Sequence, residues 1–324
     1  MVGIKDVAKK AGVSASTVSN VINGRNNISE KTREKVLAVC EELHYEPNII
    51  GKNLKTGANR TIMFSFSDFD RKFYLSIIRG ISEYAKAKDY DLIICTNKST
   101  EKFMQKAYTN GCIELDRRIP DSVLIKKAEK QYPIIAMDRL IDMPCIKSVV
   151  VNNYAAERVL IEGLVKAGYK RFAYIGGFES EDNTERFRAL TDVLSESHIL
   201  FRKEHYYDGD YTEKSGYQMA RLIMLSERRP EVLVCANDEM AIGAMRAFKE
   251  NGIRVPEDIA VCGFDDTEMA RVMGLTTVSV PNYERGYLAA QYLIEIIEGA
   301  DDFSPFLITT NVKWRNSSKK PADR

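Results

Sequence analysis

The chain has few of the residues and patterns that mark secreted, metal-binding or membrane proteins. Its 324 residues include six cysteines and three histidines. The cysteines form no C-x-x-C pair and lie mostly inside apolar runs, and no histidine stands at metal-ligand spacing from them. No apolar run reaches transmembrane length, and the N-terminus lacks the apolar core of a signal peptide. These absences predict buried free thiols in a reducing cytoplasm, no metal site and no membrane partner.

Patterns of enzymatic chemistry are also missing. There is no G-x-S-x-G motif, and none of the histidines has an obvious serine or cysteine partner. Gly176-Gly177 belongs to neither a GxGxxG nor a Gly-Lys-Ser/Thr motif, so we interpret it as a turn. The sequence therefore predicts a protein that is not an enzyme and that carries no cofactor.

Charge is balanced over the whole chain but not along it. The net charge is +1, whereas residues 1–60 hold 10 Lys+Arg and 6 Asp+Glu, a net +4. The remainder holds 37 basic and 40 acidic residues, a net −3. A basic N-terminal segment followed by a slightly acidic remainder is typical of a protein that contacts nucleic acid only through its N-terminal segment. The length predicts two or three domains.

Residues 3–23 carry two short helical patterns around a tight turn. Apolar residues of the first pattern recur at i, i+3, i+4 and i+7: Ile4, Val7, Ala8 and Ala11. Gly12 then ends this helix, and Ser14 stands where the next helix needs an N-cap. The second pattern buries Val18, Val21 and Ile22, and its opposite face is small or polar.

The small, polar face of the second helix suits the major groove of DNA. Asn can pair with adenine, Ser can pair with several partners, and an Ala methyl group can contact a thymine methyl group. An ordinary helical hairpin on a protein surface is the alternative. The side chains predicted to bind DNA here are Ser14, Ala15, Ser16, Thr17, Ser19 and Asn20. Arg25, in the following turn, and Arg33 are candidates for phosphate contacts, which would position the domain.

A third helix is predicted from Ser29 to Leu43, with an apolar stripe made of Val36, Leu37, Cys40 and Leu43. The segment IKDVAKKAGVSASTVSNVIN, followed by ISEKTREKVLAVCEELHYEPN, resembles the N-terminal headpiece of the lactose-repressor (LacI/GalR) family of bacterial transcription regulators. The resemblance continues through CANDEMAIGAMRA and VCGFDDTE and covers nearly the whole chain. It implies a helix-turn-helix headpiece at residues 1–46.

Residues 47–60 are predicted to be a hinge segment. Its helical stretch NIIGKNLK is shorter than the ~12–15 residues that a lone helix needs in water, and Gly51 weakens it by about 1 kcal/mol relative to Ala. We therefore expect it to become helical only when something holds it. The family resemblance implies a hinge helix in the operator minor groove, with Leu54 as the wedge and Asn48, Lys52 and Asn53 beside it. A plain interdomain linker is the alternative.

From residue 61 onward, strand and helix patterns alternate in two rounds. Strands are predicted at residues 62–66, 92–95, 113–115, 134–137, 149–151, 172–175, 232–235 and 259–264, and one of the helices between them has Val159, Leu160 and Leu164 as its apolar residues. This alternation predicts an α/β fold with parallel sheets and helices on both faces. The resemblance implies a periplasmic-binding-protein-like core at 61–316. It divides this core into an N-lobe (about 61–151 and 281–311) and a C-lobe (about 152–280 and 312–316), followed by a polar tail at 317–324. Only fifteen residues separate Cys95 from Gly111, so we expect a truncated second helix in the N-lobe.

Ligands of parallel sheets bind beyond the carboxyl ends of the strands. This rule selects polar residues that follow apolar runs, and the resemblance points to matching positions, adding Phe73 and Tyr74. The predicted effector-binding residues are Asp68, Phe73, Tyr74, Arg139, Asn152, Arg186, Tyr211, Asn237 and Asp265. Asn237 and Asp265 can pair with hydroxyls and Tyr211 can cover a sugar ring, although Asn237 can equally be only a helix cap.

Together these features predict a cytoplasmic, homodimeric repressor that reads twofold-symmetric double-stranded DNA. A small molecule, expected to be a sugar or glycoside, would control operator affinity allosterically from between the lobes. A purine or phosphoprotein co-repressor is the alternative within this function. A solute-binding protein would need an export signal and no headpiece, and a sugar-metabolising enzyme would need a catalytic motif.

Overall fold

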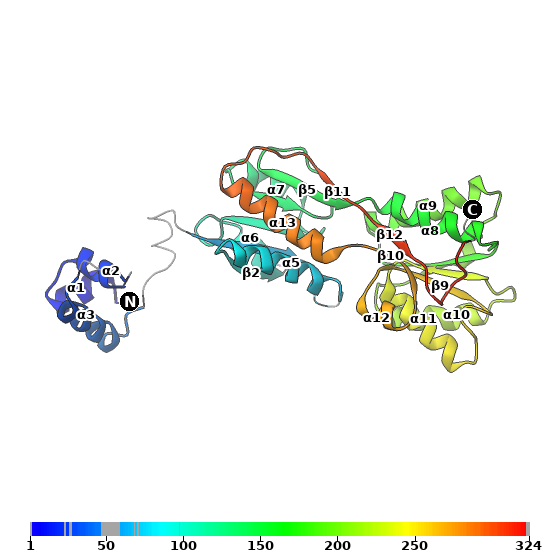
Figure 1. The fold of residues 1–324 in the computed structure, drawn as a ribbon, viewed down its shortest axis with the longest axis horizontal. Coiled ribbons are helices and arrows are strands. Elements are labelled where there is room, and N and C mark those ends of the chain that lie inside the picture. Colours follow the sequence, from blue (N-terminus) through cyan, green and yellow to red (C-terminus); the bar gives the residue numbers. More distant parts are fainter. Residues whose placement is uncertain are drawn as a thin grey trace. The chain divides into compact units, whose positions relative to one another are not determined.

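Figure 1 shows the computed structural model, which describes residues 2–22, 24–25, 28–46, 59–67, 69, 71–96 and 98–321. The chain forms two compact units that divide after Asn59. Several of the predicted site residues lie outside the described residues: Asn48, Lys52, Asn53, Leu54 and Asp68. The expected hinge therefore stays a prediction.

The first unit contains three helices, α1 (Ile4–Ala11), α2 (Ala15–Ile22) and α3 (Glu30–Glu42). Gly12 ends α1 in the left-handed conformation, with φ 64°, and its N–H reaches the last carbonyls of the helix. The Ser14 hydroxyl accepts the Thr17 N–H at 3.1 Å and so caps α2, as its position predicts. Ser29 caps α3 in the same way. Local capping chemistry thus sets the ends of these short helices.

Six aliphatic side chains form the centre of this unit: Val7, Ala8, Ala11, Val18, Val21 and Val36. The predicted stripe of α3 is wrong at one position, because Leu37 is 50% exposed. Val39 packs against the core instead, together with Cys40 and Leu43. Ile22 is only partly buried. The core is therefore smaller than the apolar pattern of the sequence predicts.

The second unit contains two six-stranded sheets. The first has the order β11-β5-β4-β3-β1-β2 and is parallel throughout. Its strands are β1 (Thr61–Phe66), β2 (Asp91–Thr96), β3 (Gly111–Leu115), β4 (Ile134–Ala136), β5 (Ile146–Val151) and β11 (Phe306–Ile308). The second has the order β12-β10-β9-β8-β6-β7, in which only β12 is antiparallel to its neighbour. Its strands are β6 (Phe172–Gly176), β7 (Tyr206–Asp208), β8 (Val232–Cys235), β9 (Ala260–Asp265), β10 (Thr276–Ser279) and β12 (Asn311–Lys313).

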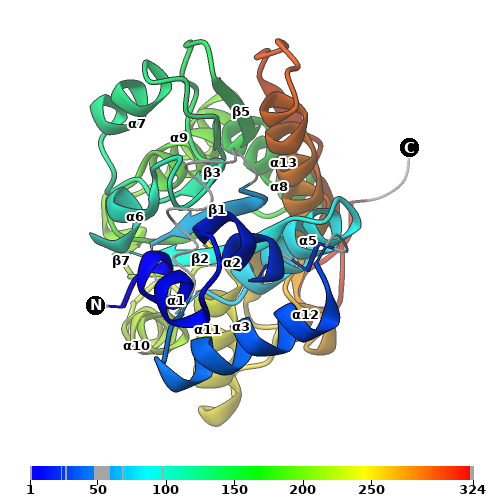
Figure 2. The ribbon, with the colours of Figure 1, turned by 90° about the vertical axis from the view of Figure 1, so that its left-hand side faces the viewer.

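Helices cover both faces of the first sheet. Alternate residues of β1 point to opposite faces: Ile62 and Phe64 pack with α5 (Tyr74–Ala87) and α13 (Asn282–Ile297), whereas Met63 packs with α6 (Lys98–Phe103) and α7 (Asp121–Ala128). Figure 2 shows these two pairs of helices on opposite sides of the sheet. The six-residue α6 confirms the truncated helix expected from the short segment before Gly111.

The second sheet is accompanied by α8 (Asn153–Lys166), α9 (Glu181–Glu196), η1 (Lys203–His205), α10 (Glu213–Met224), α11 (Asp238–Glu250) and α12 (Glu268–Val272). The apolar pattern is wrong at Val159 of α8, which is 56% exposed, while Ile161 is buried in its place. The sequence patterns identify the central strands, but they miss the edge strands β7, β11 and β12 and also β10. No helix of the described part of the chain is long and apolar enough to cross a bilayer.

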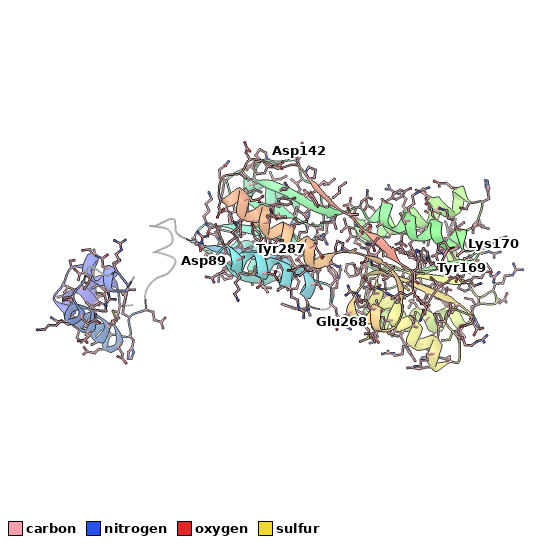
Figure 3. All side chains as sticks on the ribbon, viewed as in Figure 1. Asp89, Asp142, Tyr169, Lys170, Glu268 and Tyr287 are labelled. Carbon is pink, nitrogen blue, oxygen red and sulfur yellow. The ribbon has the colours of Figure 1, made fainter. Side chains whose placement is uncertain are left out.

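The chain passes between the two sheets three times, after β5, after β10 and after β11. The expected crossings near Asn152, Pro281 and Asn311 lie at these three places. Residues after β12 stay beside the second sheet, where the Ser317 hydroxyl donates to the Val261 carbonyl at 2.6 Å. The Lys319 N–H reaches the hydroxyl of Tyr169, a residue labelled in Figure 3, at 3.0 Å. The segment assigned to the polar tail therefore begins with residues that are built into the fold.

Candidate functional site

The predicted DNA-binding face lies at the beginning of α2. The Ser14 hydroxyl is within hydrogen-bond distance of the Ser16 hydroxyl (2.6 Å) and the Thr17 hydroxyl (2.9 Å). The Ser14 hydroxyl is thus used to cap the helix. Ser16 is exposed, and Ala15 packs partly against the headpiece core. A short, capped helix end with small side chains allows close approach of a base edge.

The turn after α2 is braced through the backbone. The Arg25 N–H donates to the Asn20 carbonyl at 3.0 Å, and the Arg33 guanidinium donates to the Arg25 carbonyl at 2.9 Å. Arg25 itself is exposed, and Ser19 and Asn20 are partly exposed. The guanidinium of Arg33 therefore shapes the turn, which leaves Arg25 as the better candidate for a phosphate contact.

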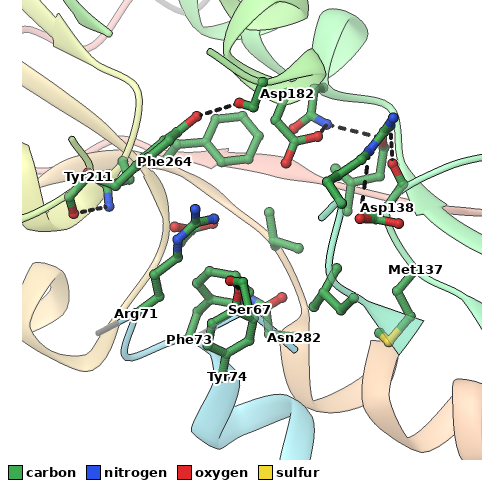
Figure 4. A pocket seen from close by; sticks show the side chains of 18 of the residues that line it. Ser67, Arg71, Phe73, Tyr74, Met137, Asp138, Asp182, Tyr211, Phe264 and Asn282 are labelled. Carbon is green, nitrogen blue, oxygen red and sulfur yellow. Dashed lines mark hydrogen bonds and ion pairs between the residues drawn. The ribbon is translucent and has the colours of Figure 1, made fainter. Parts of the chain in front are cut away.

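A cavity of about 310 Å³ lies where the carboxyl ends of the strands of both sheets meet. Six of the predicted effector residues line it: Phe73, Tyr74, Arg186, Tyr211, Asn237 and Asp265. In Figure 4, Arg71, Phe73, Tyr74 and Asn282 lie on one side of the pocket, and Tyr211, Phe264 and Asp182 lie on the other. Both lobes thus contribute to one site.

Arg186, on α9, is a rigid donor at the base of the cleft. Its Nε and Nη2 donate to the Asn153 Oδ1 at 3.0 and 2.8 Å, and its Nη1 donates to the Ala236 carbonyl. The guanidinium lies 3.5 Å from the centre of the Phe264 ring. These bonds use three of its five N–H groups, so Arg186 retains donors for a ligand.

Asp265 and Tyr211 both adopt positive φ angles, 114° and 68°, which non-glycine residues rarely do outside functional sites and tight turns. Burial raises the pKa of Asp265 to about 7, an effect that Arg186 partly opposes. At neutral pH its carboxyl group can therefore both donate to and accept from a hydroxyl. The Tyr211 hydroxyl pairs with the Ser180 hydroxyl at 3.0 Å, which holds the ring against the cleft.

Asn237 combines the two roles considered for it. Its Oδ1 accepts the Met240 N–H at 3.1 Å and caps α11. Its Nδ2 donates to the Tyr211 carbonyl at 2.9 Å and to Glu239 Oε2 at 3.0 Å, so both amide donors are used. Only the second lone pair of Oδ1 is left for a ligand. Asn237 therefore lines the cavity mainly by positioning the Tyr211 loop.

Two of the predicted effector residues are corrected by the structure, because neither lines the cavity. Asn152 is exposed and caps α8 by accepting the Ala155 N–H at 2.9 Å, and its neighbour Asn153 faces the cleft instead. Arg139 is buried in bonds to carboxylates, including Asp138 at 2.8 Å and Asp121 at 2.9 Å. It positions Asp138, which does line the cavity.

Several charged residues of the cavity wall are absent from the set predicted from the sequence. Asp116, Arg117 and Arg118 come directly after β3, so the rule of strand ends could have found them. Arg71 lies in the loop before α5, and Arg285 lies inside α13. No local signal distinguishes these two from surface arginines. Among the described residues, no group of three or more His, Cys, Asp or Glu is arranged to hold a metal ion.

Two contacts join the lobes across the cleft. Arg117, of the first lobe, pairs with Glu181 at the start of α9 and also approaches Asp138 at 3.6 Å. The guanidinium of Arg71 lies 4.7 Å from the centre of the Tyr211 ring and 5.0 Å from that of Phe178. A ligand in the cavity would sit beside both contacts and would therefore influence how closely the lobes approach.

Comparison with known proteins places these features in context. Residues 3–48 match the model for bacterial regulatory proteins of the lacI family, and residues 161–318 match that for a periplasmic binding protein-like domain. The chain is 33% identical over 316 residues to the HTH-type transcriptional repressor PurR of Erwinia tasmaniensis. The alignment covers 92% of this chain and 91% of the relative. The lac repressor dimer bound to operator and the anti-inducer ONPF aligns with a TM-score of 0.76 at 28% identity, covering 98% of each chain. The transcriptional regulator CelR in complex with cellobiose aligns with a TM-score of 0.71 at 25% identity, covering 98% of this chain and all of that one (100%).

Proposed function

Because the chain belongs to the lacI family of bacterial regulatory proteins, we propose that it is a repressor whose affinity for operator DNA is controlled by a small molecule bound between its two lobes. The observation that carries this proposal is the cavity that both lobes line, in a chain whose headpiece has a capped helix-turn-helix. The proteins it resembles over most of their length are transcriptional regulators and not enzymes.

The effector is a sugar or glycoside of modest size. A cavity of about 310 Å³ stands at the lower end of the ~300–1,000 Å³ typical of ligand pockets. Its walls combine aromatic rings, from Phe73 and Tyr211, with a carboxyl group that both donates and accepts, from Asp265. Rings cover the apolar face of a sugar and polar groups pair with its hydroxyls. The solved complex of CelR, a relative in fold, holds cellobiose.

The effector acts through the angle between the lobes. Contacts such as Arg117 with Glu181 already join the lobes, and a ligand that touches both sides changes which arrangement is favoured. The strand β1 follows the predicted hinge segment 47–60 directly in the chain, so a change in the first lobe reaches the hinge. Coupling of this kind is reciprocal, and operator must alter effector affinity by the same factor.

Two copies of the chain bind one operator. A twofold-symmetric dimer reads a twofold-symmetric site, with one headpiece in each half. Ser16, Asn20 and their neighbours on α2 contact base edges, and Arg25 contacts a phosphate. The paired hinge segments place Leu54 at the central base step, which an apolar wedge can unstack and kink.

Selection of bound sequences from a random duplex pool by the full-length protein tests this function. The expected result is a palindromic consensus with a flexible central step, whose affinity changes when the right small molecule is added. Binding to all sequences alike, with only a strong dependence on salt, would overturn the proposal of sequence-specific recognition.

A further inference from the structure

Arg285 is a buried cation that pairs with no carboxylate among the described residues. It lies near the start of α13, and its side chain is 7% exposed and lines the cleft. Its Nη2 donates to the Met137 carbonyl, whereas its Nε is buried without any hydrogen-bond partner. None of the ion pairs found among the described residues includes Arg285.

This arrangement is unfavourable in an empty cleft. Removing a guanidinium from water costs free energy that a paired anion normally offsets. Burial lowers the pKa of Arg285, and the carboxylates around it, led by Asp182 and Asp138, oppose this shift only in part. Asp138 is already paired with Arg139, and Asp182 already accepts a hydrogen bond from Asn153. Within the described part of the chain no carboxylate forms an ion pair with Arg285, so an anion bound in the cleft can supply that partner.

A second cation faces the same cavity. Arg71 stacks on the rings of Tyr211 and Phe178, and within the described part of the chain it has no ion pair (Figure 4). Of the other arginines of the lining, Arg117 pairs with Asp138 and Arg118 pairs with Asp116. Arg186 has no ion pair among the described residues, but its guanidinium is held by hydrogen bonds to Asn153 and to the Ala236 carbonyl. The lining contains five arginines and four aspartates, so its formal charge is +1 even when every carboxyl is ionised.

Asn282 adds an unused acceptor beside this positive charge. It lies one turn before Arg285 on α13, is 6% exposed, and lines the same cavity. Its Oδ1 is buried without a hydrogen-bond partner. A buried acceptor of this kind needs a donor such as a hydroxyl group. Arg285 can thus bind an anionic group and Asn282, one turn away on α13, can accept a hydrogen bond from a hydroxyl group in the same cleft.

We propose, on the basis of the regulator function proposed above, that the effector is an anion: a small polyhydroxylated molecule whose carboxylate or phosphate group is bound by Arg285. A hydroxyl group of the same molecule donates to Asn282 Oδ1. Arg71 provides a second positive charge while its guanidinium covers the aromatic rings of the opposite lobe. A neutral sugar leaves Arg285 unpaired and binds more weakly.

Thermal unfolding of the full-length protein tests the proposal at fixed pH and ionic strength. The probes are inorganic phosphate, galacturonate, glucuronate and glucose 6-phosphate, with galactose, glucose and sodium chloride for comparison. The proteins are the wild type, Arg285→Met, Arg285→Lys, Arg71→Met and, as a control on the exposed face of α10, Arg221→Met. The difference between the carboxylate and phosphate probes identifies which anionic group the site prefers.

At least one anionic probe is expected to raise the Tm of the wild type and of Arg221→Met by about 5 °C at a hundredfold excess over its Kd. This shift should vanish in Arg285→Met, with an affinity loss of at least about tenfold, and should survive in part in Arg285→Lys and Arg71→Met. If no anion stabilises the wild type more than it stabilises Arg285→Met, or if the neutral sugars shift Tm equally, the proposal is overturned.

An operator gel-shift assay separates this proposal from the function on which it rests. If a neutral sugar releases operator and the anions do not, the anionic effector is wrong and the regulator function stands. If the stabilising anion also changes operator affinity, both are supported. A protein that selects no operator at all contradicts the regulator function, while the Tm assay still decides whether the cleft binds anions.

Discussion

At the scale of single residues, burial sets the protonation of carboxyl groups around the cleft. Glu157, on α8, is 1% exposed, its Oε1 has no partner, and burial raises its pKa to about 8, with Arg186 opposing the shift. Its ordinary value in an unfolded chain lies near 4.5. Between these values the native state holds a proton that the unfolded state releases, so stability falls as pH rises through this window.

Replacing Glu157 with Gln should remove that pH dependence. The variant Glu157→Gln is expected to gain on the order of a few kcal/mol relative to the wild type at pH 8, and much less at pH 5. Urea denaturation at the two pH values measures the difference. Glu298→Gln, on the exposed end of α13, is the control and should behave alike at both. An equal effect of Glu157→Gln at both pH values would show that Glu157 is ionised in the folded protein.

Asp265 lines the cavity, and we expect the effector response to depend on it directly. Asp265→Asn keeps the shape and tolerates the positive φ, but it loses the ability to act as a carboxylate acceptor. We expect effector affinity to fall at least about tenfold, and effector-dependent release of operator to disappear. Operator titrations with and without effector measure this, with the exposed Asp301→Asn as the matched control. A normal response of Asp265→Asn would mean that the effector binds elsewhere.

At the scale of elements, the pocket depends on how closely α5 and α13 approach. A Cβ atom at Gly80 would lie 2.1 Å from the Tyr283 carbonyl oxygen, and one at Gly286 would lie 2.2 Å from the Ile77 carbonyl oxygen. The two helices therefore touch backbone to backbone, which only glycine permits. Because α5 carries Tyr74 at its start and α13 carries Arg285, this contact sets the distance between two walls of the cavity.

Gly80→Ala should force these helices apart. The added methyl group meets backbone and not a flexible side-chain end, so we expect a loss of about 1–3 kcal/mol in the free energy of unfolding. Effector affinity should fall as well, because Tyr74 and Asn282 move with their helices. Ser82→Ala, on the exposed face of α5, should change neither quantity. Undiminished stability of Gly80→Ala would show that the helices can separate at no cost.

At the scale of the whole molecule, the proposed function requires that the headpiece, the hinge segment and the two lobes act together. Each part has its own core: six buried residues of the headpiece form one cluster, and the second sheet and its helices form another. The contacts described between the lobes are made by charged side chains, such as Arg117 with Glu181 and Arg71 with the Tyr211 ring. Weak polar contacts between well-packed bodies allow the bodies to move without unfolding.

Leu54→Ala tests whether the hinge contributes to operator recognition. The wedge proposed for Leu54 predicts that the variant loses specific operator affinity by about tenfold or more, because the cost of unstacking is no longer offset. Effector affinity, measured without DNA, should be unchanged, since Leu54 is proposed to contact DNA and not the effector. Gel-shift titration and calorimetry measure the two affinities. An equal loss of both would refute the wedge and indicate a general defect.

The sequence by itself determined the parts of the protein that depend on neighbours along the chain. The helices of the headpiece were predictable because caps such as Ser14 and Gly12 act within one turn. Most of the central strands were predictable because a parallel strand buried on both faces is a continuous apolar run. The central strand β10 was missed because its residues, TTVS, do not form such a run although they are largely buried. The edge strands β7 and β12 were missed, because they are largely unburied and leave no such run.

The tertiary structure alone decided which side chains meet in the cleft. Of the adjacent pair Asn152 and Asn153, one caps a helix and the other holds Arg186, a choice that depends on where α9 packs. Arg139 and Arg285 look alike in the sequence, yet the fold surrounds the first with carboxylates, whereas no described carboxylate pairs with the second. The environment of a charge is set by residues far away in the chain, and local sequence patterns carry no record of them.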